Sequence, residues 1–422
     1  MRIFNGVWRR RIRPLVLTAI RRHLTGGVPT PRRETTVSAI ARRAARGVPD
    51  GGDGLVTWIP FASSPARVLP PRSVDGDVAA FAAVLARIDG NASRMAHVRR
   101  LEGTVVERLS PRFAAVLAGG RVTHDSGIVF SAAGGILTDV SGLGVGSDLP
   151  GNPLRLAYLP RPRRLTGVVA VLSTGRSENY YHWMTEALPR LELYERSGLT
   201  IDRYYAPTRH AFHRESLALL GIQPDRVLPA TGTAHVEADA LVVAPLDDVL
   251  AREKIEYLAE RLGAAAARCT GASGPRIFVA RRGRRSRAIV NESAVMAALA
   301  PLGFTPCRLE TLPLAAQVAA FRRAECVVAP HGAGLTNLAF CRPGTRVVEI
   351  GTPYRPWSCF WEIAHHRRLD YHLHLAKPVH VRHFDPTTGI GDSDIEVDPS
   401  ALRDCVERQL AGQTSGTIRA AS

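Results

Sequence analysis

A histidine and a glutamate four residues apart, His182 and Glu186, have the types and spacing of a general base and the group that orients it. Asn179 is a residue that caps helices, and the segment after it predicts a helix to Arg196 with a break at Pro189. Residues four apart share one helix face, so the carboxylate can orient the imidazole, which then accepts a proton from a hydroxyl group. Two alternatives stay open: Glu186 is itself the base, or the pair is a structural surface contact.

The stretch from Cys326 to Asn337 has the composition of a buried strand that ends in a glycine-rich turn. Gly332 and Gly334 let the backbone turn tightly and approach a ligand. Thr336 and Asn337 favour a helix start, so the pattern predicts backbone N–H groups and a helix dipole facing a phosphate. A dinucleotide-binding turn needs a third glycine where Asn337 stands, which disfavours an NAD site.

Two side chains next to this turn suit a nucleotide. His331 precedes the first glycine, where an imidazole can hydrogen-bond a diphosphate or a ribose. Glu349 lies near the end of the next predicted strand and can accept hydrogen bonds from ribose hydroxyls. An aromatic cluster that includes Tyr354 and Trp357 follows directly.

Arginines precede the turn along the chain. Arg281 and Arg287 follow a predicted strand, and Asn291 predicts the cap of a helix that begins at Glu292. Strand and helix patterns alternate from there, which predicts a parallel sheet with ligands at the carboxyl ends of its strands. Both arginines are therefore expected at the same edge as His331, where guanidinium groups suit diphosphate oxygens.

These motifs resemble glycosyltransferase family 61, the capsular-polysaccharide-type transferases. The likeness spans roughly Leu165 to Glu362 and consists of two blocks in the family's order. The first block runs from Glu178 to Leu191, and the second from Ile277 to Ile350. The family more often has Asp where this chain has Glu186, so the resemblance leaves the identity of the base open.

The resemblance implies an α/β fold of GT-B type, with two Rossmann-like lobes and a cleft between them. It implies inverting transfer of a sugar from a nucleoside-diphosphate sugar, with a UDP-sugar favoured, and no metal or other cofactor. The expected acceptor is a glycan or a lipid-linked acceptor in surface or capsular polysaccharide synthesis.

The same scheme assigns roles to residues of this chain. His182 or Glu186 is the catalytic base. The expected donor-binding residues are Arg281, Arg287, Asn291, Glu292, His331, Gly332, Ala333, Gly334, Thr336, Asn337 and Glu349. The expected acceptor-binding residues are Glu178, Asn179, Tyr181, Trp183 and Arg190, of which the aromatic ones can stack on sugar faces.

Gly/Pro-rich breaks and this scheme together predict the domains. Residues 1–54 are a basic N-terminal extension, and residues 55–270 are the acceptor-side lobe. Residues 271–378 are the nucleotide-sugar-binding lobe. Residues 379–422 are a C-terminal helix and tail that pack back on the N-terminal lobe. A long helix from Asp248 to Arg268 is expected to connect the halves.

The composition narrows the partners. The formal net charge is +17, yet Lys254 and Lys377 are the only lysines, and arginine is scattered over every segment. A nucleic-acid-binding stripe with interleaved aromatics is not seen, so no nucleic-acid partner is expected. The histidines between His365 and His383 lack the spacing of a metal site.

Six cysteines without paired spacing indicate buried free thiols in a reducing compartment. No apolar run reaches the length of a membrane span. The segment from Met1 to Arg22 has one short apolar run flanked by arginines, which predicts a surface helix or, alternatively, a peripheral contact with the inner membrane leaflet. The expected location is cytoplasmic.

Two other functional classes are weighed against glycosyl transfer. A non-catalytic polysaccharide-binding or assembly protein would keep the fold but lose His182, Glu186, Arg287 or His331, and all four are present. An NAD-dependent epimerase is disfavoured by Asn337. The sequence does not name the sugar, the nucleotide base, the acceptor or the linkage.

Overall fold

The structure is a computed structural model of the 422-residue chain. It describes residues 28–29, 34–46, 51–62, 67–68, 71–76, 78–89, 105–106, 111–141, 158–246, 250–269, 274–281, 287–355, 357–384 and 391–412. The chain folds as two compact units, one from residues 1–63 and 110–248 and the other from residues 64–109 and 249–422. The surface helix expected over Met1–Arg22 lies outside the described residues.

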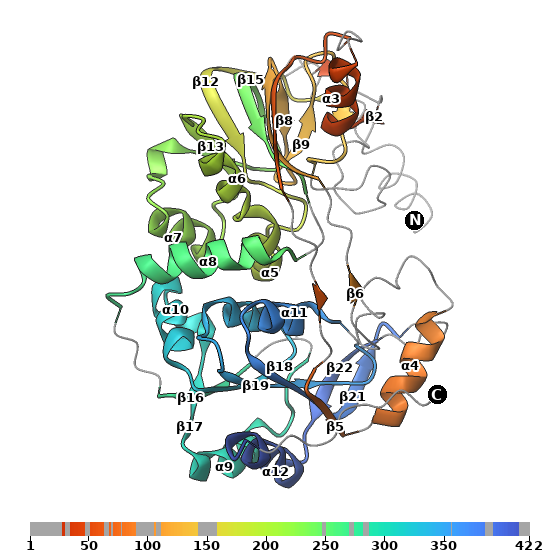
Figure 1. Cartoon of the computed structure of the whole chain (residues 1–422), viewed down its shortest axis with the longest axis vertical. Coiled ribbons are helices and arrows are strands. Elements are labelled where there is room, and N and C mark those ends of the chain that lie inside the picture. Colours follow the sequence, from red (N-terminus) through yellow and green to blue (C-terminus); the bar gives the residue numbers. More distant parts are fainter. Residues whose placement is uncertain are drawn as a thin grey trace, which may run out of the picture. The chain divides into compact units, whose positions relative to one another are not determined.

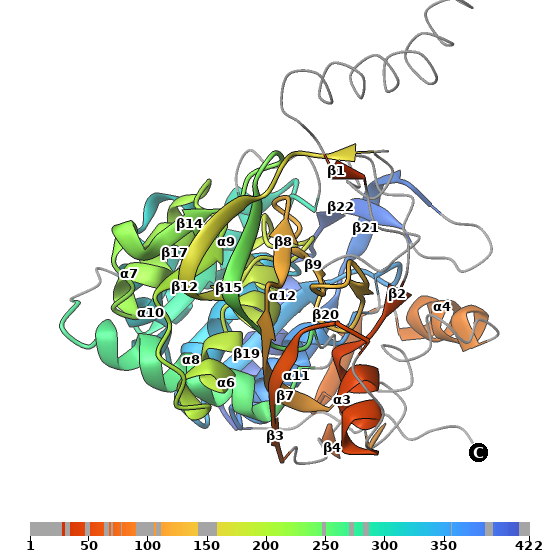
Figure 2. The ribbon, with the colours of Figure 1, turned by 90° about the horizontal axis from the view of Figure 1, so that it is seen from above.

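The first unit is built on a ten-stranded mixed sheet. Its parallel part has the order β14 (Val227–Pro229), β13 (Arg203–Ala206), β12 (Arg163–Val171) and β15 (His235–Val243). Figure 2 shows β12 and β15 side by side. Beyond β15 the sheet continues with β7 (Arg112–Ala118), β8 (Arg121–Thr123), β9 (Ile128–Phe130), β10 (Ile136–Leu137), β3 (Leu55–Phe61) and β2 (Glu34–Thr35). The strands β1 (Val28–Pro29) and β11 (Tyr158–Leu159) form a separate antiparallel pair.

The helices of the first unit include the segment that follows β12. It consists of α5 (Tyr180–His182), the π-helical η4 (Trp183–Ala187) and α6 (Arg190–Arg196), which confirms the predicted helix with a break at Pro189. The remaining helices are α3 (Val37–Ala45), α7 (Ala211–Leu219) and η5 (Pro224–Arg226). Strand residues such as Leu117, Val171 and Leu241 are fully buried in the core of this unit.

The second unit contains a six-stranded sheet in which every pairing is parallel. The order is β17 (Phe304–Cys307), β16 (Arg276–Val279), β18 (Cys326–Pro330), β19 (Arg346–Gly351), β20 (Asp370–Leu375) and β5 (Ser73–Gly76). This confirms the predicted alternation of strands and helices around a parallel sheet. Two small antiparallel pairs join β21 (Lys377–Arg382) to β22 (Asp392–Glu396) and β4 (Arg67–Val68) to β6 (Val105–Val106).

Helices cover both faces of this sheet (Figure 1). On one face, α9 (Glu292–Leu299) packs against α12 (Pro399–Leu410), and Leu299 and Leu402 meet Phe278 and Val328 of the sheet. The other face carries α8 (Arg252–Ala265), α10 (Leu314–Arg323), the 3-10 helix η8 (Ala333–Phe340) and α11 (Cys359–His366), which contact one another. This unit also contains α4 (Val78–Asp89) and the short 3-10 helices η6 (Ala300–Leu302) and η7 (Leu309–Thr311).

Each unit has one point at which its parallel strand order reverses. In the first unit the chain steps from β12 to β13 and β14 and then crosses back to β15. In the second unit it steps from β16 to β17 and then crosses back to β18. In open α/β sheets ligands bind outside the carboxyl ends of the strands at such a point. The fold therefore favours the loop after β12 and the loops after β16 and β18 as ligand sites.

The unit boundaries differ from the predicted domains. Residues 34–46, expected in the N-terminal extension, belong to the first unit, where β2 pairs with β10 and Val37 and Ile40 lie in the core. Residues 64–109, expected in the N-terminal lobe, belong to the second unit, because β5 pairs with the edge strand β20. The helix α8, expected as a connection between halves, also belongs to the second unit. The C-terminal helix α12 begins and ends where predicted, and within the second unit it packs on α9 and β19 and contacts Asp75 of β5.

Within the described ranges, no helix is long and apolar enough to cross a membrane. All six cysteines are free, and Cys307, Cys326, Cys341 and Cys405 are buried, as the sequence predicted.

Candidate functional site

His182 and Glu186 lie in the helical segment that follows the carboxyl end of β12. Nδ1 of His182 is 2.5 Å from Oε1 of Glu186. The side chain of His182 is 23% exposed, whereas that of Glu186 is 7% exposed. The imidazole therefore lies closer to solvent than the carboxylate that contacts it.

The helix geometry around this pair is irregular. The N–H of Leu188 donates to the carbonyl of Trp183, five residues back, which makes the turn from Trp183 to Ala187 π-helical. Single π-helical turns occur frequently at functional sites. Asn179 caps the segment as predicted, with its side chain accepting from the N–H of Tyr181.

Glu186 has a second cationic neighbour. The guanidinium of Arg176 lies 3.3 Å from the same oxygen, Oε1, that contacts His182. The other oxygen, Oε2, is buried and has no hydrogen-bond partner among the described residues. A carboxylate that accepts from Nδ1 favours the tautomer whose Nε2 carries a free lone pair. In this arrangement His182 can accept a proton at Nε2, and Glu186 orients the ring.

Three of the predicted acceptor contacts flank this pair. The ring of Tyr181 meets that of His182 edge-on, with centroids 5.1 Å apart. Glu178 is exposed and lies 2.9 Å from Nε2 of His210, at the carboxyl end of β13. Asn179 is exposed but uses its side-chain oxygen for the helix cap. Tyr181 and Glu178 are thus placed at the surface beside His182.

The other two predicted acceptor contacts face the interior, contrary to the expectation. Trp183 is fully buried, and its Nε1 donates to Oγ of Ser216 on α7. Arg190 is 2% exposed and donates to the carbonyls of Val140 and Val171. Their burial follows from helical periodicity, which turns this side of the segment toward the sheet. Both side chains hold the segment in place rather than contact a sugar.

A buried histidine on α7 supports the same segment. His213 is fully buried; its Nε2 donates to the carbonyl of Ser177, and its ring meets that of Trp183 edge-on. Burial is the largest effect on the pKa of His213 and lowers it to about 4. The hydrogen bond to Ser177 raises this pKa, and His210 and Arg214 lower it further, each to a smaller extent. The side chain is therefore neutral at pH 7.

We expect the chain to lose stability between pH 7.5 and pH 5.5 through His213. Because the unfolded state has the higher pKa, it binds the proton first, so the stabilisation is complete above pH 6.5 and falls as the pH drops toward 4. This difference removes roughly 1.3 kcal/mol from the free energy of unfolding at pH 5.5. Urea unfolding of the wild type and of His213→Gln, which can still donate to Ser177, measures the effect. An equal pH-dependent loss in both proteins would contradict the assignment.

In the second unit, His331 follows the carboxyl end of β18. Its Nδ1 is 2.5 Å from Oε1 of Glu349, and the hydroxyl of Tyr371 donates to the other oxygen of Glu349 at 2.5 Å. Burial lowers the pKa of His331, with Arg355 and Arg287 adding to the effect and Glu349 opposing it. The neutral ring thus donates through Nδ1 and keeps an acceptor lone pair at Nε2.

This geometry corrects the role predicted for Glu349. The carboxylate is 2% exposed, and each of its oxygens already has a protein partner. A strand residue at this position points into the layer between the sheet and α11 instead of out of the carboxyl edge. Glu349 therefore orients His331 and is not free to bind a ribose.

Arg281 lies across the glycine-rich turn. Its NH1 donates to the carbonyl of His331 at 2.8 Å, and its backbone N–H donates to Oε2 of Glu292. A Cβ at position 332 would come within 2.3 Å of the Arg281 guanidinium. Gly332 therefore makes room for the arginine. The predicted neighbourhood of Arg281, Glu292 and His331 is realised in the structure.

The helix after the turn spans Ala333–Phe340, whereas the sequence predicted a short helix from Leu338 to Cys341 with its start signal at Thr336 and Asn337. Its first N–H groups have no partner within the helix, as at any helix start. Gly334 is required for packing, since a Cβ there would lie 2.8 Å from Leu309. Thr336 is buried with its hydroxyl unpartnered among the described residues, and buried Asn337 donates to Gln317. These last two side chains fix the turn from inside.

Asn291 has a structural role that the sequence did not indicate. Its side chain donates to the carbonyl of Val397 and accepts from the N–H of the same residue. It makes no side-chain cap on α9. The residue ties the start of α9 to the chain after β22 and does not face the glycine-rich turn.

Arg287 lies in a cluster that sequence reasoning recognised only in part. Its Nε is 3.6 Å from Oδ1 of Asp392, and NH1 of Arg355 is 3.4 Å from the same oxygen. Arg355 follows β19 just as His331 follows β18, but in the sequence it reads as part of an aromatic stretch. The signal that could have identified it is its place at the carboxyl end of a parallel strand.

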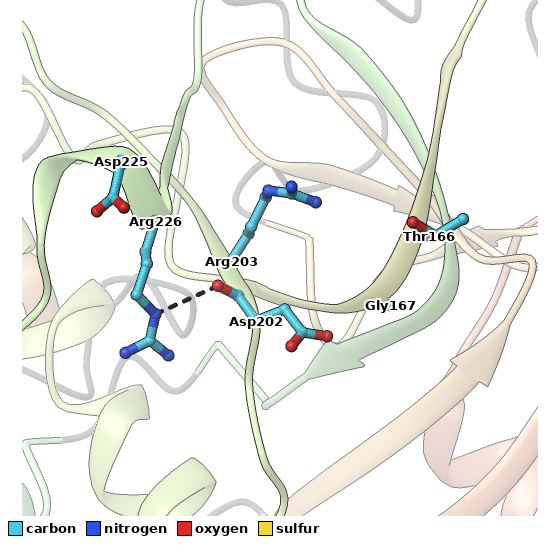
Figure 3. A pocket seen from close by; sticks show the side chains of 6 residues that line it. All are labelled: Thr166, Gly167, Asp202, Arg203, Asp225 and Arg226. Atoms are coloured by element: carbon cyan, nitrogen blue, oxygen red, sulfur yellow. Dashed lines mark hydrogen bonds between the residues drawn. The ribbon is translucent and has the colours of Figure 1, made fainter.

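One open cavity of about 390 Å³ lies elsewhere (Figure 3). It is lined by Thr166, Gly167, Asp202, Arg203, Asp225 and Arg226. Thr166 and Gly167 lie within β12, and the other four residues lie at the amino ends of β13 and β14, the edge opposite to His182. Arg226 is already engaged with the backbone carbonyls of Asp202 and Ile201. The cavity contains none of the predicted site residues.

Fold and site together define a mixed α/β protein with parallel sheets, in which titratable and cationic groups gather where parallel strands end. Residues 180–348 match the family model described as Glycosyltransferase 61, which supports the predicted likeness to glycosyltransferase family 61. No protein with a curated description matches the chain.

One solved structure with a weak likeness is that of the dodecameric iron-containing heptosyltransferase TibC in complex with ADP-D-beta-D-heptose. The two chains are 14% identical with a TM-score of 0.27, and the likeness covers 60% of this chain and 68% of TibC. A likeness at this level supports no inference about the present chain.

Proposed function

We propose that the protein is an inverting glycosyltransferase that moves a sugar from a nucleoside-diphosphate sugar to a glycan or lipid-linked acceptor in surface or capsular polysaccharide synthesis. The family match supports glycosyl transfer as the class of reaction. The proposal includes a GT-B-type organisation in which each parallel-sheet unit is one lobe.

The observation that carries the proposal is the His182–Glu186 pair. Single displacement with inversion needs a base that removes a proton from the acceptor hydroxyl as it attacks the sugar. His182 has the required features, namely a solvent-accessible ring and a carboxylate that contacts Nδ1. Glu186 is more deeply buried, which favours the orienting role for it and the base role for His182.

The second unit supplies groups suited to the donor. The neutral Nε2 of His331 accepts hydrogen bonds, so it suits a ribose hydroxyl better than a diphosphate. Arg281 and the first N–H groups of η8 suit the diphosphate, because they place positive charge beside developing negative charge on the leaving group. With these groups the departure of the diphosphate needs no divalent cation, and a UDP-sugar is the donor we propose to test first.

A donor screen tests the function. We expect purified protein to release a free nucleoside diphosphate from one of several nucleotide sugars, faster when a glycan or lipid-linked acceptor is added. The released diphosphate and the extended acceptor are measured in the same reaction. Absence of turnover with every nucleotide sugar and acceptor class would overturn the proposal.

Removal of divalent cations tests metal independence. We expect turnover in EDTA to equal turnover in buffer containing magnesium, because arginine and main-chain N–H groups carry the charge stabilisation. Initial rates with and without EDTA are compared at one donor concentration. Complete loss in EDTA, restored by added magnesium or manganese, would show that a metal takes this role instead.

A further inference from the structure

Three adjacent parallel strands of the second unit each deliver a cationic or imidazole side chain at their carboxyl ends. Arg281 follows β16, His331 follows β18 and Arg355 follows β19. Arg355 has not been given a role by the sequence motifs. It lies four residues beyond the end of β19, the strand next to β18 and one strand further from the point where the strand order reverses.

Within the described residues, Arg355 and Arg287 lie beside the same carboxylate, that of Asp392. Oδ1 of Asp392 lies 3.4 Å from NH1 of Arg355 and 3.6 Å from Nε of Arg287. The side chains of Arg287, Arg355 and Asp392 are 22%, 28% and 23% exposed, so a ligand can reach the cluster. Two guanidinium groups around one carboxylate leave an excess positive charge.

Each of the two arginines also has an N–H group that makes no hydrogen bond within the described residues. Nε of Arg287 and Nε of Arg355 are buried and make no hydrogen bond within the described part of the chain. Burial and the neighbouring Arg287 guanidinium lower the pKa of Arg355. Partly desolvated like charges repel each other, and a bound anion would relieve that repulsion.

The backbone of Arg287 is in a strained conformation at this cluster. Arg287 has φ of 60°, in the left-handed region that residues with a side chain rarely adopt. The next residues are held by β22: Ala288 donates to Asp394, and Ile289 pairs with Ile395. Such outliers persist where the surroundings over-determine them, often at ligand sites.

We propose that Arg355 and Arg287, held together by Asp392, form an anion site that grips the pyrophosphate of the donor. The inference rests on the proposed function and adds Arg355 as a binding residue. Guanidinium groups are planar forks that bind phosphate oxygens in pairs. In this arrangement Asp392 keeps the two forks apart and oriented when the site is empty.

The test uses inorganic pyrophosphate and UDP as probes, with affinities measured by calorimetry on the full chain. We expect Arg355→Gln to bind each probe about 10- to 100-fold more weakly, since it loses a charge-assisted hydrogen-bonding fork. Arg355→Lys should fall in between, because it keeps the charge but not the fork. The matched control is Arg403→Gln, an arginine on α12 that pairs with Glu407 and, within the described contacts, touches none of Arg287, Arg355 and Asp392; its affinities should equal those of the wild type.

A second measurement separates binding from folding. Without ligand, Arg355→Gln should unfold at the same temperature as the wild type, because losing the ion pair is offset by relief of repulsion from Arg287. Pyrophosphate should then raise the unfolding temperature of the wild type more than that of the variant. If the folded variant binds both probes as tightly as the wild type, or if the wild type binds neither, the proposed site is wrong.

The outcomes also separate this inference from the proposed function. If the wild type transfers sugar, and Arg355→Gln has the same turnover and the same pyrophosphate affinity, only the anion site is refuted. Arg355-dependent pyrophosphate binding without any sugar transfer would refute only the glycosyltransferase proposal.

Discussion

Replacing His182 by Asn should lower kcat for sugar transfer by about 10²- to 10⁴-fold, the usual contribution of a positioned general base. The ring carries the proton-accepting nitrogen, is partly exposed and contacts the buried carboxylate of Glu186. The affinity for nucleoside diphosphates should stay unchanged, because the donor groups lie in the other unit. Initial rates at saturating donor and a calorimetric titration with UDP measure the two quantities.

A comparison with Glu186→Gln decides between the two candidate bases. If His182 is the base, the glutamine variant keeps part of the activity and its pH–rate profile shifts, since the imidazole loses its charged partner. If Glu186 is the base, Glu186→Gln loses at least as much activity as His182→Asn. The control is His380→Gln, which replaces a 68% exposed histidine of the second unit and should leave kcat unchanged.

Replacing Glu192 by Gln should destabilise the chain by about 3–5 kcal/mol, the usual effect of removing one partner of a buried ion pair. Glu192 on α6 pairs with Arg112 on β7, whose side chain is 2% exposed, and also with Arg196. The substitution keeps the shape and removes the carboxylate charge that faces the buried guanidinium of Arg112. The shift of the urea unfolding midpoint measures the loss.

A surface pair on α12 provides the matched control. Glu407 and Arg403 are four residues apart like Glu192 and Arg196, but their side chains are 43% and 45% exposed. Glu407→Gln should change the stability by no more than about 0.5 kcal/mol, because exposed pairs are screened by water and salt. The double variant Arg112→Met, Glu192→Leu should regain much of the loss, because no buried charge remains unpaired. A mild effect of Glu192→Gln alone would contradict this account of the buried pair.

Local patterns in the sequence were sufficient for most elements near the site. The apolar run at Cys326 is a buried central strand, as predicted, since both faces of a parallel sheet are covered by helices. Pro189 interrupts its helix because it lacks an N–H donor. Asp398 and Pro399 begin α12 as expected from capping chemistry. These features depend on neighbours in the sequence, so sequence reasoning finds them.

Long-range pairings were not accessible in the same way. The strand β5 is four residues long and joins β20 through partners some 300 positions away, such as Ser73 with His372. The burial of Trp183 and Arg190 depends on which side of the helix faces the sheet. Asp392 reaches Arg287 and Arg355 because β22 holds the segment after Arg287. None of these contacts leaves a periodic or local signal.

By itself, the sequence determined the parallel α/β architecture, the glycine-rich turn, the likeness to glycosyltransferase family 61 and the pairing of His182 with Glu186, because each follows from residue type and short spacing. Only the tertiary structure decided that Glu349 orients His331, that Trp183 and Arg190 are interior, and that Arg355 joins Arg287 around one carboxylate. The physical reason is that a side chain's role is set by burial and by partners distant in the chain, and those come into being only when the strands are assembled.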